Sequence, residues 1–155
     1  PMCGSGTILI EAAMIANNIP VNINRPEFAF EKWNDFDEDL FEKIHDSLLK
    51  KVTNSDKKII GYDKAPSAIR KAIDNVKNAS LEEFITIERQ NFFDSEKPTE
   101  GKTLVLFNPP YGERLEINVP VFYKEIGNTL KQGYTDTDVW FITSDFDNGL
   151  KRSEE

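Results

Sequence analysis

The sequence has 155 residues, of which 39% are hydrophobic and 30% are charged, and its formal net charge is −8. These values indicate one globular domain, because no apolar run approaches the roughly 20 residues that a bilayer requires. The excess of acid argues against autonomous nucleic-acid binding, which normally needs a basic face for phosphate contacts. The single cysteine, Cys3, excludes an internal disulfide, and the N-terminus has no export signal pattern, so the cytoplasm is the expected compartment.

Helical and strand patterns alternate along the chain. Residues 5–17 predict a helix that is apolar on most faces, with Ser5 or Thr7 as its cap. Residues 20–36 have no period and predict an ordered loop, and a helix is expected from Asp37 to about Val52. The later elements are expected as strands at 58–63, 84–91, 103–108 and 138–145 and as helices at 65–79 and 120–131. The continuous apolar run at 103–108 is typical of a strand covered on both faces, and 138–145 is expected as a further buried strand.

This alternation predicts parallel βαβ units in a three-layer α/β domain. In such sheets a ligand lies beyond the carboxyl ends of the strands. Four places then become candidates for a site: the turn that holds Gly4 and Gly6, and the strand ends at Asp63, Asn91 and Asn108. All four carry glycine or polar residues, and this coincidence is the main reason to expect a binding site.

The turn "PMCGSGT" (1–7) precedes the first predicted helix. Its glycines let the backbone pass close to a ligand, and the helix N-terminus offers free N–H groups. A dinucleotide fingerprint would need a third glycine where Leu9 stands, and the Gly-Lys-Ser/Thr of a P-loop is absent. The turn therefore suits a nucleoside-like ligand that carries a carboxylate. The alternative is an ordinary tight turn.

Asp63 and Asn91 end two successive predicted strands. A carboxylate at the position of Asp63 can accept both hydroxyls of a ribose, or it can cap the following helix, and both roles can hold together. The spacing of 63 − 6 = 57 residues exceeds the roughly 20 of a simple βαβ unit, which predicts an insertion at about 20–56. Asn91 could hydrogen-bond an adenine edge, and Phe92 or Phe93 could stack on the base or simply pack.

The stretch "LVLFNPPYGERL" (104–115) places an amide, two prolines and an aromatic ring at the end of a strand. The side-chain oxygen of Asn108 and the carbonyl of Pro109 can both accept hydrogen bonds from one NH₂ group, and Tyr111 can stack on the base that carries it. The stretch therefore fits a planar substrate with an exocyclic amine. The alternative is a strand and turn that the prolines simply terminate.

Other chemistries have less support in the sequence. His45 lies in an acidic predicted helix with no second histidine or cysteine nearby, so a solvated residue is expected there and no metal. Ser5 and Ser144 lack a histidine partner for triad chemistry.

Three segments carry a family resemblance, namely 1–16 (PMCGSGTILIEAAMIA), 61–79 (GYDKAPSAIRKAIDNVKNA) and 104–115. Together they resemble the S-adenosylmethionine-dependent RNA methyltransferases that carry a THUMP domain, a UPF0020-like group. The nearest members are the bacterial 23S ribosomal RNA guanine-N2 methyltransferases, a group that also includes proteins described as N6-adenine-specific DNA methylases. The resemblance extends into the expected insertion, through Trp33 and Phe36.

The resemblance implies a Rossmann-like class I methyltransferase fold that binds S-adenosylmethionine. Gly4 and Gly6 would line the methionine moiety, and Asp63 would hold the ribose. The full set of implied cofactor-binding residues is Cys3, Gly4, Gly6, Thr7, Asp63, Asn91, Phe92 and Asn108. The residues implied to orient the target amine are Asn108, Pro109, Pro110 and Tyr111.

The sequence also departs from the family pattern. The family has an acid where Asn91 stands, and it has a first strand, terminal strands and an N-terminal THUMP region that these 155 residues do not contain. We therefore expect residues 1–155 to be a partial catalytic domain with exposed strand edges, which invite strand exchange or aggregation. RNA affinity would come from the THUMP region.

Three functions stay open on the sequence: methylation of guanine N2 in 23S ribosomal RNA, methylation of adenine N6 in DNA or RNA, and an inactive binding or assembly module. A nicotinamide-dependent oxidoreductase is disfavoured by Leu9 and by the residues around Asn108.

Overall fold

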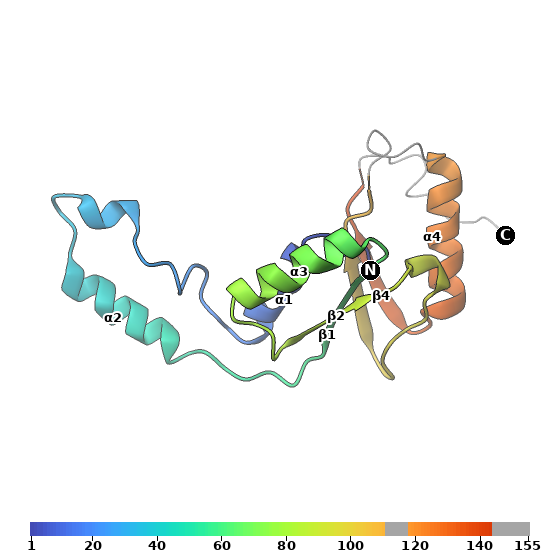
Figure 1. The fold of residues 1–155 in the computed structure, drawn as a ribbon. Coiled ribbons are helices and arrows are strands. Elements are labelled where there is room, and N and C mark those ends of the chain that lie inside the picture. Colours follow the sequence, from blue (N-terminus) through green and yellow to red (C-terminus); the bar gives the residue numbers. More distant parts are fainter. Residues whose placement is uncertain (111–117, 144–155) are drawn as a thin grey trace.

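The computed structural model of the chain describes residues 1–110 and 118–143. Its elements are, in chain order, α1 (Thr7–Ala16), the 3₁₀ turn η1 (Ala29–Lys32), α2 (Glu38–Leu49), β1 (Ile59–Asp63), α3 (Pro66–Asn78), β2 (Ile85–Arg89), the 3₁₀ turn η2 (Phe92–Asp94), β3 (Thr103–Phe107), α4 (Val119–Gly133) and β4 (Thr137–Phe141) (Figure 1). The predicted helices and strands are confirmed within these residues, whereas the two 3₁₀ turns were not expected. No helix in the described ranges is long and apolar enough to cross a membrane.

The four strands form two parallel pairs, β1 with β2 and β3 with β4. The register runs from Ile59 opposite Ile85 to Asp63 opposite Arg89 in the first pair. In the second pair it runs from Thr103 opposite Thr137 to Phe107 opposite Phe141. The predicted parallel βαβ units are therefore confirmed, and the two strands of each pair end together at the same edge.

Successive side chains of β1 point to opposite faces of the sheet, and each face is covered by a helical layer. The Cβ position of Gly61 lies only 2.1 Å from Leu9 Cδ1, so Gly61 faces α1. The next residue, Tyr62, must face the opposite side, and its hydroxyl hydrogen-bonds that of Tyr134 at the end of α4. Because α3 packs beside α1, these two helices cover one face and α4 covers the other. The α/β three-layer prediction is confirmed.

One hydrophobic cluster joins the two strand pairs. It combines Tyr62 of β1, Val105 and Phe107 of β3 and Ile126 of α4 with two further rings, all of them buried. A second cluster, around Leu9, lies between α1, α3 and the first strand pair. The shared cluster holds the pairs side by side, and Met2 packs against it.

The predictions that β3 is covered on both faces and that β4 is a buried strand are wrong. Val105 and Phe107 point into the core beneath α4, but Leu104 on the other face is 63% exposed and Trp140 is 69% exposed. α4 and Phe92 of η2 pack on the inner face of this strand pair, and the exposure of Leu104 and Trp140 shows that the other face is open. An apolar run alone cannot distinguish a strand with one covered face from a strand with two.

Residues 18–57 form an arm that extends from the body and carries η1 and α2 far from the sheet (Figure 1). The base of the arm is closed by Asn17, which is 1% exposed. Its backbone oxygen accepts from Thr53 N at 2.8 Å, and its Oδ1 accepts from Ser55 N at 2.7 Å. Its Nδ2 donates to Ala13 O at 2.8 Å. One asparagine thus fixes both ends of the arm to the end of α1.

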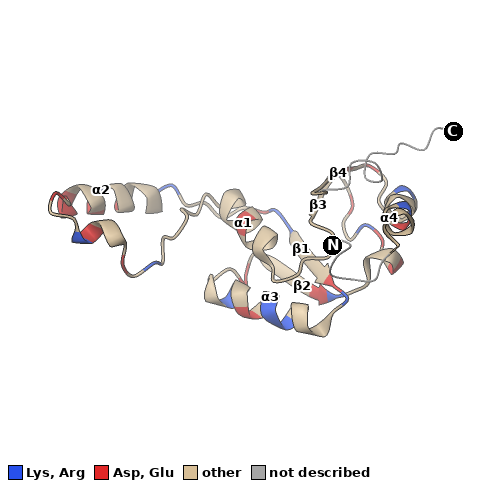
Figure 2. Ribbon diagram, turned by 90° about the horizontal axis from the view of Figure 1, so that it is seen from above, with Lys and Arg blue, Asp and Glu red and all other residues tan. Residues whose placement is uncertain are grey.

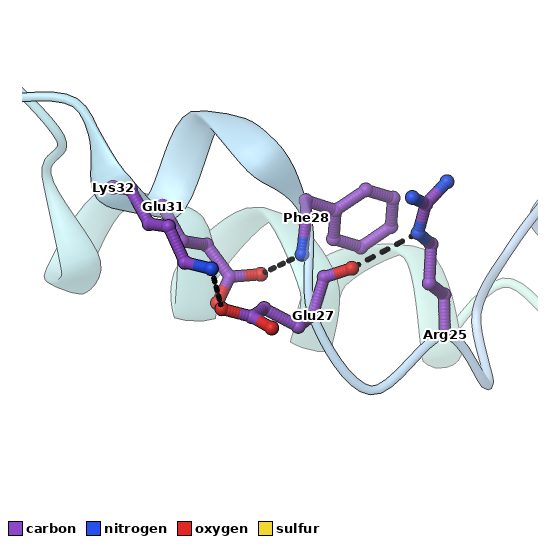
Figure 3. A network of polar contacts seen from close by, with 5 residues as sticks. All are labelled: Arg25, Glu27, Phe28, Glu31 and Lys32. Atoms are coloured by element: carbon purple, nitrogen blue, oxygen red, sulfur yellow. Dashed lines mark hydrogen bonds and ion pairs between the residues drawn. The ribbon is translucent and has the colours of Figure 1, made fainter.

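The arm holds a cluster of partly exposed aromatic rings, contributed by Phe28, Phe30, Trp33, Phe36 and Phe41. A polar network closes its tip, in which Glu31 Oε1 accepts from Phe28 N at 2.8 Å and Lys32 Nζ lies 2.8 Å from Glu27 Oε1 (Figure 3). Around the cluster the chain is exposed, and Leu40 of α2 is 53% accessible.

Candidate active site

The candidate site lies at the edge where the strands end. Asp63 is the last residue of β1, Asn91 follows the end of β2, and Asn108 follows the last residue of β3. The turn of residues 1–6 runs beside β1 and joins it through a hydrogen bond from Cys3 N to Tyr62 O at 3.0 Å. Each residue that the resemblance implies for cofactor binding or for orienting the amine, apart from Tyr111, therefore has a described position at or next to this edge or turn. Tyr111 lies outside the described residues.

Asp63 ties the glycine turn to the start of α3. Its Oδ2 accepts a hydrogen bond from Gly4 N at 3.1 Å, and its Oδ1 accepts one from Ala65 N at 2.9 Å. The alternative that Asp63 caps the following helix is wrong, because the N-cap of α3 is Ala65 and it has no side-chain cap hydrogen bond; Asp63 instead closes the turn before the helix. Each carboxylate oxygen has two acceptor sites, so these bonds leave capacity for two further donors.

Gly4 leaves room for a ligand, whereas Gly6 does not. Gly4 has a φ of +55°, and a Cβ built on it would meet no atom within 4 Å. Gly6 has a φ of +84°, and its Cβ would lie 3.2 Å from Ala72 Cβ of α3. A side chain at Gly4 would fill the open space, while Gly6 allows α1 and α3 to approach each other.

The first turn of α1 has no side-chain cap. Its N-cap is Gly6, so the expectation that Ser5 or Thr7 caps this helix is wrong. Ser5 Oγ and Thr7 Oγ1 instead lie 3.3 Å apart at the surface, and Ser5 O accepts from Asn75 Nδ2 at 2.9 Å. The uncapped N–H groups suit an anionic ligand group.

Cys3 lies beside the carboxylate of Asp63. Burial of the half-buried Cys3 thiol raises its pKa, and the negative charge of Asp63 raises it further. The thiol is therefore held protonated and is a poor nucleophile at neutral pH.

Asn91 is engaged with a carboxylate that the sequence reading overlooked. Its Nδ2 donates to Asp94 Oδ2 at 2.7 Å, which leaves its second N–H and its carbonyl oxygen for a ligand. The three-residue spacing between Asn91 and Asp94 is a turn pattern, and it was the available signal for this pair. Asn75, which holds the glycine turn from α3, gave no such signal.

Phe92 is a core residue. It is 3% exposed, and its ring packs against those of Phe93, Phe107 and Tyr134 at centroid distances of 5.6 to 5.7 Å. Of the two roles left open for this ring, stacking on a base or packing, the structure shows packing. The reason is its place in η2, which turns the ring inward beneath β3.

The prolines after β3 differ in exposure. Pro109 is fully buried and Pro110 is half-buried, whereas Asn108 is exposed. Pro109 thus anchors the strand end in the core while Asn108 remains accessible. Ile142 N donates to Phe107 O at 3.2 Å, which extends the pairing of the two strands up to this point.

Neither α3 nor the arm has a uniformly basic face, because both carry acidic as well as basic side chains in the view of Figure 2. Within residues 1–110 and 118–143, no group of three or more histidine, cysteine or acidic side chains could hold a metal ion. His45 lies in α2, where its ring is tilted against that of Phe41.

A family model described as UPF0020: RMKL-like, methyltransferase domain, matches residues 1–149. The ribosomal RNA large subunit methyltransferase K/L of Hahella chejuensis is 36% identical over 152 residues, which is 93% of this chain. The same enzyme of Vibrio campbellii is 36% identical over 138 residues, or 84% of this chain. The chain spans about a fifth of the length of these relatives, 21% and 20%.

Solved structures share the fold. The crystal structure of SMU.472 complexed with SAH matches 100% of this chain with a TM-score of 0.87 and 30% identity, over 42% of its own chain. A predicted N6-adenine-specific DNA methylase from Listeria monocytogenes matches 93% with a TM-score of 0.81 and 35% identity, over 38% of its chain. The chain therefore has the Rossmann-like class I methyltransferase fold and belongs to the UPF0020 family, as an RMKL-like methyltransferase domain.

Proposed function

We propose that this chain is the catalytic part of an S-adenosylmethionine-dependent methyltransferase that acts on the exocyclic amine of a nucleobase, with guanine N2 of 23S ribosomal RNA as its target. The family match and the names of the curated relatives support RNA methylation. The SAH bound in the SMU.472 structure supports the cofactor. The observation that carries the proposal is the link between Asp63 and Gly4 at the end of β1.

The glycine turn and Asp63 fit the cofactor. The open space over Gly4 admits a ligand against the backbone, and the uncapped N–H groups from Thr7 onward suit the carboxylate of the methionine moiety. Asp63 keeps acceptor capacity for the ribose hydroxyls after it has bonded Gly4 and Ala65. Cys3 and Gly6 would line this part of the site through their backbone.

Recognition of the adenine falls to the segment after β2. Asn91 spends one N–H of its Nδ2 on Asp94, so its second N–H and its carbonyl oxygen would be available to hydrogen-bond the edge of the base. Because the ring of Phe92 is buried, this residue would contribute only backbone atoms.

The residues after β3 would orient the target amine. The side-chain oxygen of Asn108 and the carbonyl of Pro109 would accept its two hydrogens, which draws the nitrogen lone pair out of conjugation. Burial of Pro109 fixes the position of that carbonyl. Tyr111 would stack on the base, and Pro110 would hold the turn rigid.

When bound, S-adenosylmethionine supplies a methyl group on a sulfonium, which is the electrophile. A nitrogen–carbon bond forms as the carbon–sulfur bond breaks, and the nitrogen then releases one proton to solvent. No residue needs to remove that proton beforehand. The contribution of the chain is therefore orientation and exclusion of water.

RNA affinity would come mainly from outside this chain. A net charge of −8 opposes phosphate binding over most of the surface. A THUMP region in the same polypeptide would supply the missing basic contacts.

The first test is a calorimetric titration of the folded chain with S-adenosylmethionine. Asp63→Ala removes the proposed ribose acceptor, and Asp74→Ala, an exposed acid on α3, is the matched control. We expect saturable binding that is lost in Asp63→Ala and unchanged in Asp74→Ala. A folded chain that binds no cofactor would support the inactive binding or assembly module instead.

A second candidate target is adenine N6, which the similarity to the Listeria N6-adenine-specific DNA methylase favours. Nucleoside analysis after incubation with 23S ribosomal RNA and with DNA distinguishes the two targets, because one product is N2-methylguanosine and the other is an N6-methylated adenine nucleoside. Asn108→Ala should abolish either product while cofactor affinity falls little.

A further inference from the structure

Three hydroxyl groups meet in the core between the strand pairs. They belong to Tyr62 of β1, Ser95 after η2 and Tyr134 at the end of α4, which are 3%, 5% and 4% exposed. Ser95 Oγ lies 2.6 Å from the hydroxyl of Tyr134 and 3.2 Å from that of Tyr62. The two tyrosine hydroxyls also hydrogen-bond each other.

The direction of the bonds follows from counting protons. Ser95 Oγ donates its single proton to Phe92 O at 2.7 Å, so it must accept from Tyr134. Tyr134 then has no proton left for Tyr62, and Tyr62 must be the donor of their shared bond. The result is a series of hydrogen bonds in one direction, in which Tyr62 donates to Tyr134, Tyr134 donates to Ser95, and Ser95 donates to the backbone oxygen of Phe92.

Both ends of this series of hydrogen bonds lie next to residues of the proposed cofactor site. Tyr62 directly precedes Asp63, and Phe92 directly follows Asn91. A second contact holds the same region, because Lys97 N donates to Gly133 O at 2.8 Å. Gly133 has no space for a side chain, since its Cβ would lie 2.9 Å from Ser95 O.

Simple packing does not require hydroxyls here. Phenylalanine would fill nearly the same volume as tyrosine, and replacing a whole set of buried polar partners by apolar groups is often nearly neutral. A fully satisfied buried network, by contrast, specifies one arrangement of the elements that it joins. Four separate parts of the chain are joined by these bonds: β1, η2, the segment that follows it, and α4.

We propose that the hydroxyls of Tyr62, Ser95 and Tyr134 act as a positioning group, which holds the segment from Asn91 to Asp94 against the Asp63 end of β1 and thereby sets the affinity for the adenosine part of the cofactor. The inference rests on the proposed function, because it assumes that these two strand ends bind adenosine. None of the three side chains touches the ligand in this assignment. They act by fixing the positions of Asn91 and Asp63 relative to each other.

The test compares two variants, Ser95→Ala and Tyr134→Phe, with Ile126→Val, a control from the same hydrophobic cluster. Calorimetric titration with S-adenosylhomocysteine gives the Kd, and thermal unfolding gives the Tm. We expect each of the first two variants to raise the Kd by about three- to tenfold, the equivalent of one buried hydrogen bond. Ile126→Val should lower the Tm without changing the Kd.

The double variant sharpens the result. If the hydroxyls act as one group, Ser95→Ala with Tyr134→Phe should raise the Kd little beyond Ser95→Ala alone. Amide exchange is an independent readout of position. Asp94 N and Ser95 N, bonded to Asn91 O and Phe92 O, should exchange faster in Tyr134→Phe than in Ile126→Val.

Two outcomes overturn the inference in distinguishable ways. If the original chain binds S-adenosylhomocysteine and both hydroxyl variants keep its Kd while their Tm falls, the cluster is only structural and the proposed function stands. If the folded original chain does not bind S-adenosylhomocysteine, the proposed function fails and this inference fails with it.

Discussion

At the scale of single residues, Gly61 is the point at which α1 comes closest to the sheet. A methyl group there would overlap the side chain of Leu9, whose Cδ1, Cδ2 and Cγ lie 2.1, 2.9 and 3.0 Å from the Cβ position. Gly61→Ala should therefore lower the free energy of unfolding by about 1–3 kcal/mol, as overpacked cores do. The midpoint of urea unfolding measures this change.

Gly127 provides the matched control within α4. Nothing lies within 4 Å of its Cβ position, so Gly127→Ala adds helix propensity without a clash. It should raise the free energy of unfolding by about 0.5–1 kcal/mol. Shifts of the same sign in both variants would contradict the close approach at Gly61.

Cys3 gives a prediction about pH. Burial, and secondly the charge of Asp63, raise the pKa of its thiol in the folded chain, so the thiolate appears only at higher pH than in an unfolded chain. Alkylation of Cys3 by iodoacetamide at pH 8 should be slower in the native chain than in urea. Removing the neighbouring charge with Asp63→Asn should lower the pKa and speed alkylation.

The same shift affects stability, because a raised folded pKa means that the unfolded chain releases the thiol proton first. The contribution of Cys3 to the free energy of unfolding is complete below the ordinary thiol pKa of about 8.5 and is lost as pH rises through the pKa of the folded chain.

For the alkylation experiment, a rate in Asp63→Asn equal to that of the original chain would show that the carboxylate does not influence the thiol.

The positions of polar residues at the strand ends were predictable from the sequence, but their contacts were not. Asp63 stands out as an acid at the end of a predicted strand, whereas its bonds to Gly4 and Ala65 depend on the tertiary structure. Phe92 could not be placed, since its burial depends on how η2 turns beneath β3. The pairing of Asn91 with Asp94 and the hydroxyl cluster of Tyr62 likewise arise from tertiary contacts that leave no periodic pattern.

At the scale of elements, Phe41 is the residue that joins α2 to the rest of the arm. Its ring lies 5.7 to 6.1 Å from the rings of Phe28, Phe30 and Phe36. Because the arm extends from the body, Phe41→Ala should loosen the arm without unfolding the domain. Amide exchange in α2 should rise by about tenfold or more, from a loss of roughly 1.5 kcal/mol or more for a partly buried ring.

Leu40→Ala is the neighbouring control, since Leu40 also lies in α2 and is 53% exposed. It should leave exchange in α2 nearly unchanged. Faster exchange in α3 upon Phe41→Ala would mean that the arm is coupled to the body more strongly than its contacts suggest.

Element types followed from periodicity and breakers. The predicted helices at 65–79 and 120–131 are α3 and α4, each with a proline in the first turn. The segment 20–36 could only be predicted as a loop, and its departure from the body could not, because aromatic residues without a period do not reveal which surface they pack on. The open faces of β3 and β4 were missed for a related reason, since exposure depends on neighbours in space.

At the scale of the whole molecule, one face of the second strand pair is apolar and uncovered. Leu104, Leu106, Trp140 and Ile142 are 63%, 42%, 69% and 54% exposed. Exposed patches of this kind and open strand edges promote association. The 155-residue chain should therefore self-associate as its concentration rises, and Trp140→Arg should weaken this association. Light scattering coupled to size exclusion measures the effect.

Trp33→Arg is the control, because Trp33 is 67% exposed but lies on the arm. It should leave the association unchanged. A larger effect of Trp33→Arg than of Trp140→Arg would place the contact on the arm and contradict the prediction.

The closure of the arm at Asn17 has a consequence for how this domain can vary. Both ends of the arm reach the same asparagine, so the chain leaves the body and returns to it at one point. The helix before this point and the strand after it keep their positions whatever lies between them. An arm of different length or composition can therefore replace this one between homologous domains. The strand ends that form the candidate active site then keep their positions.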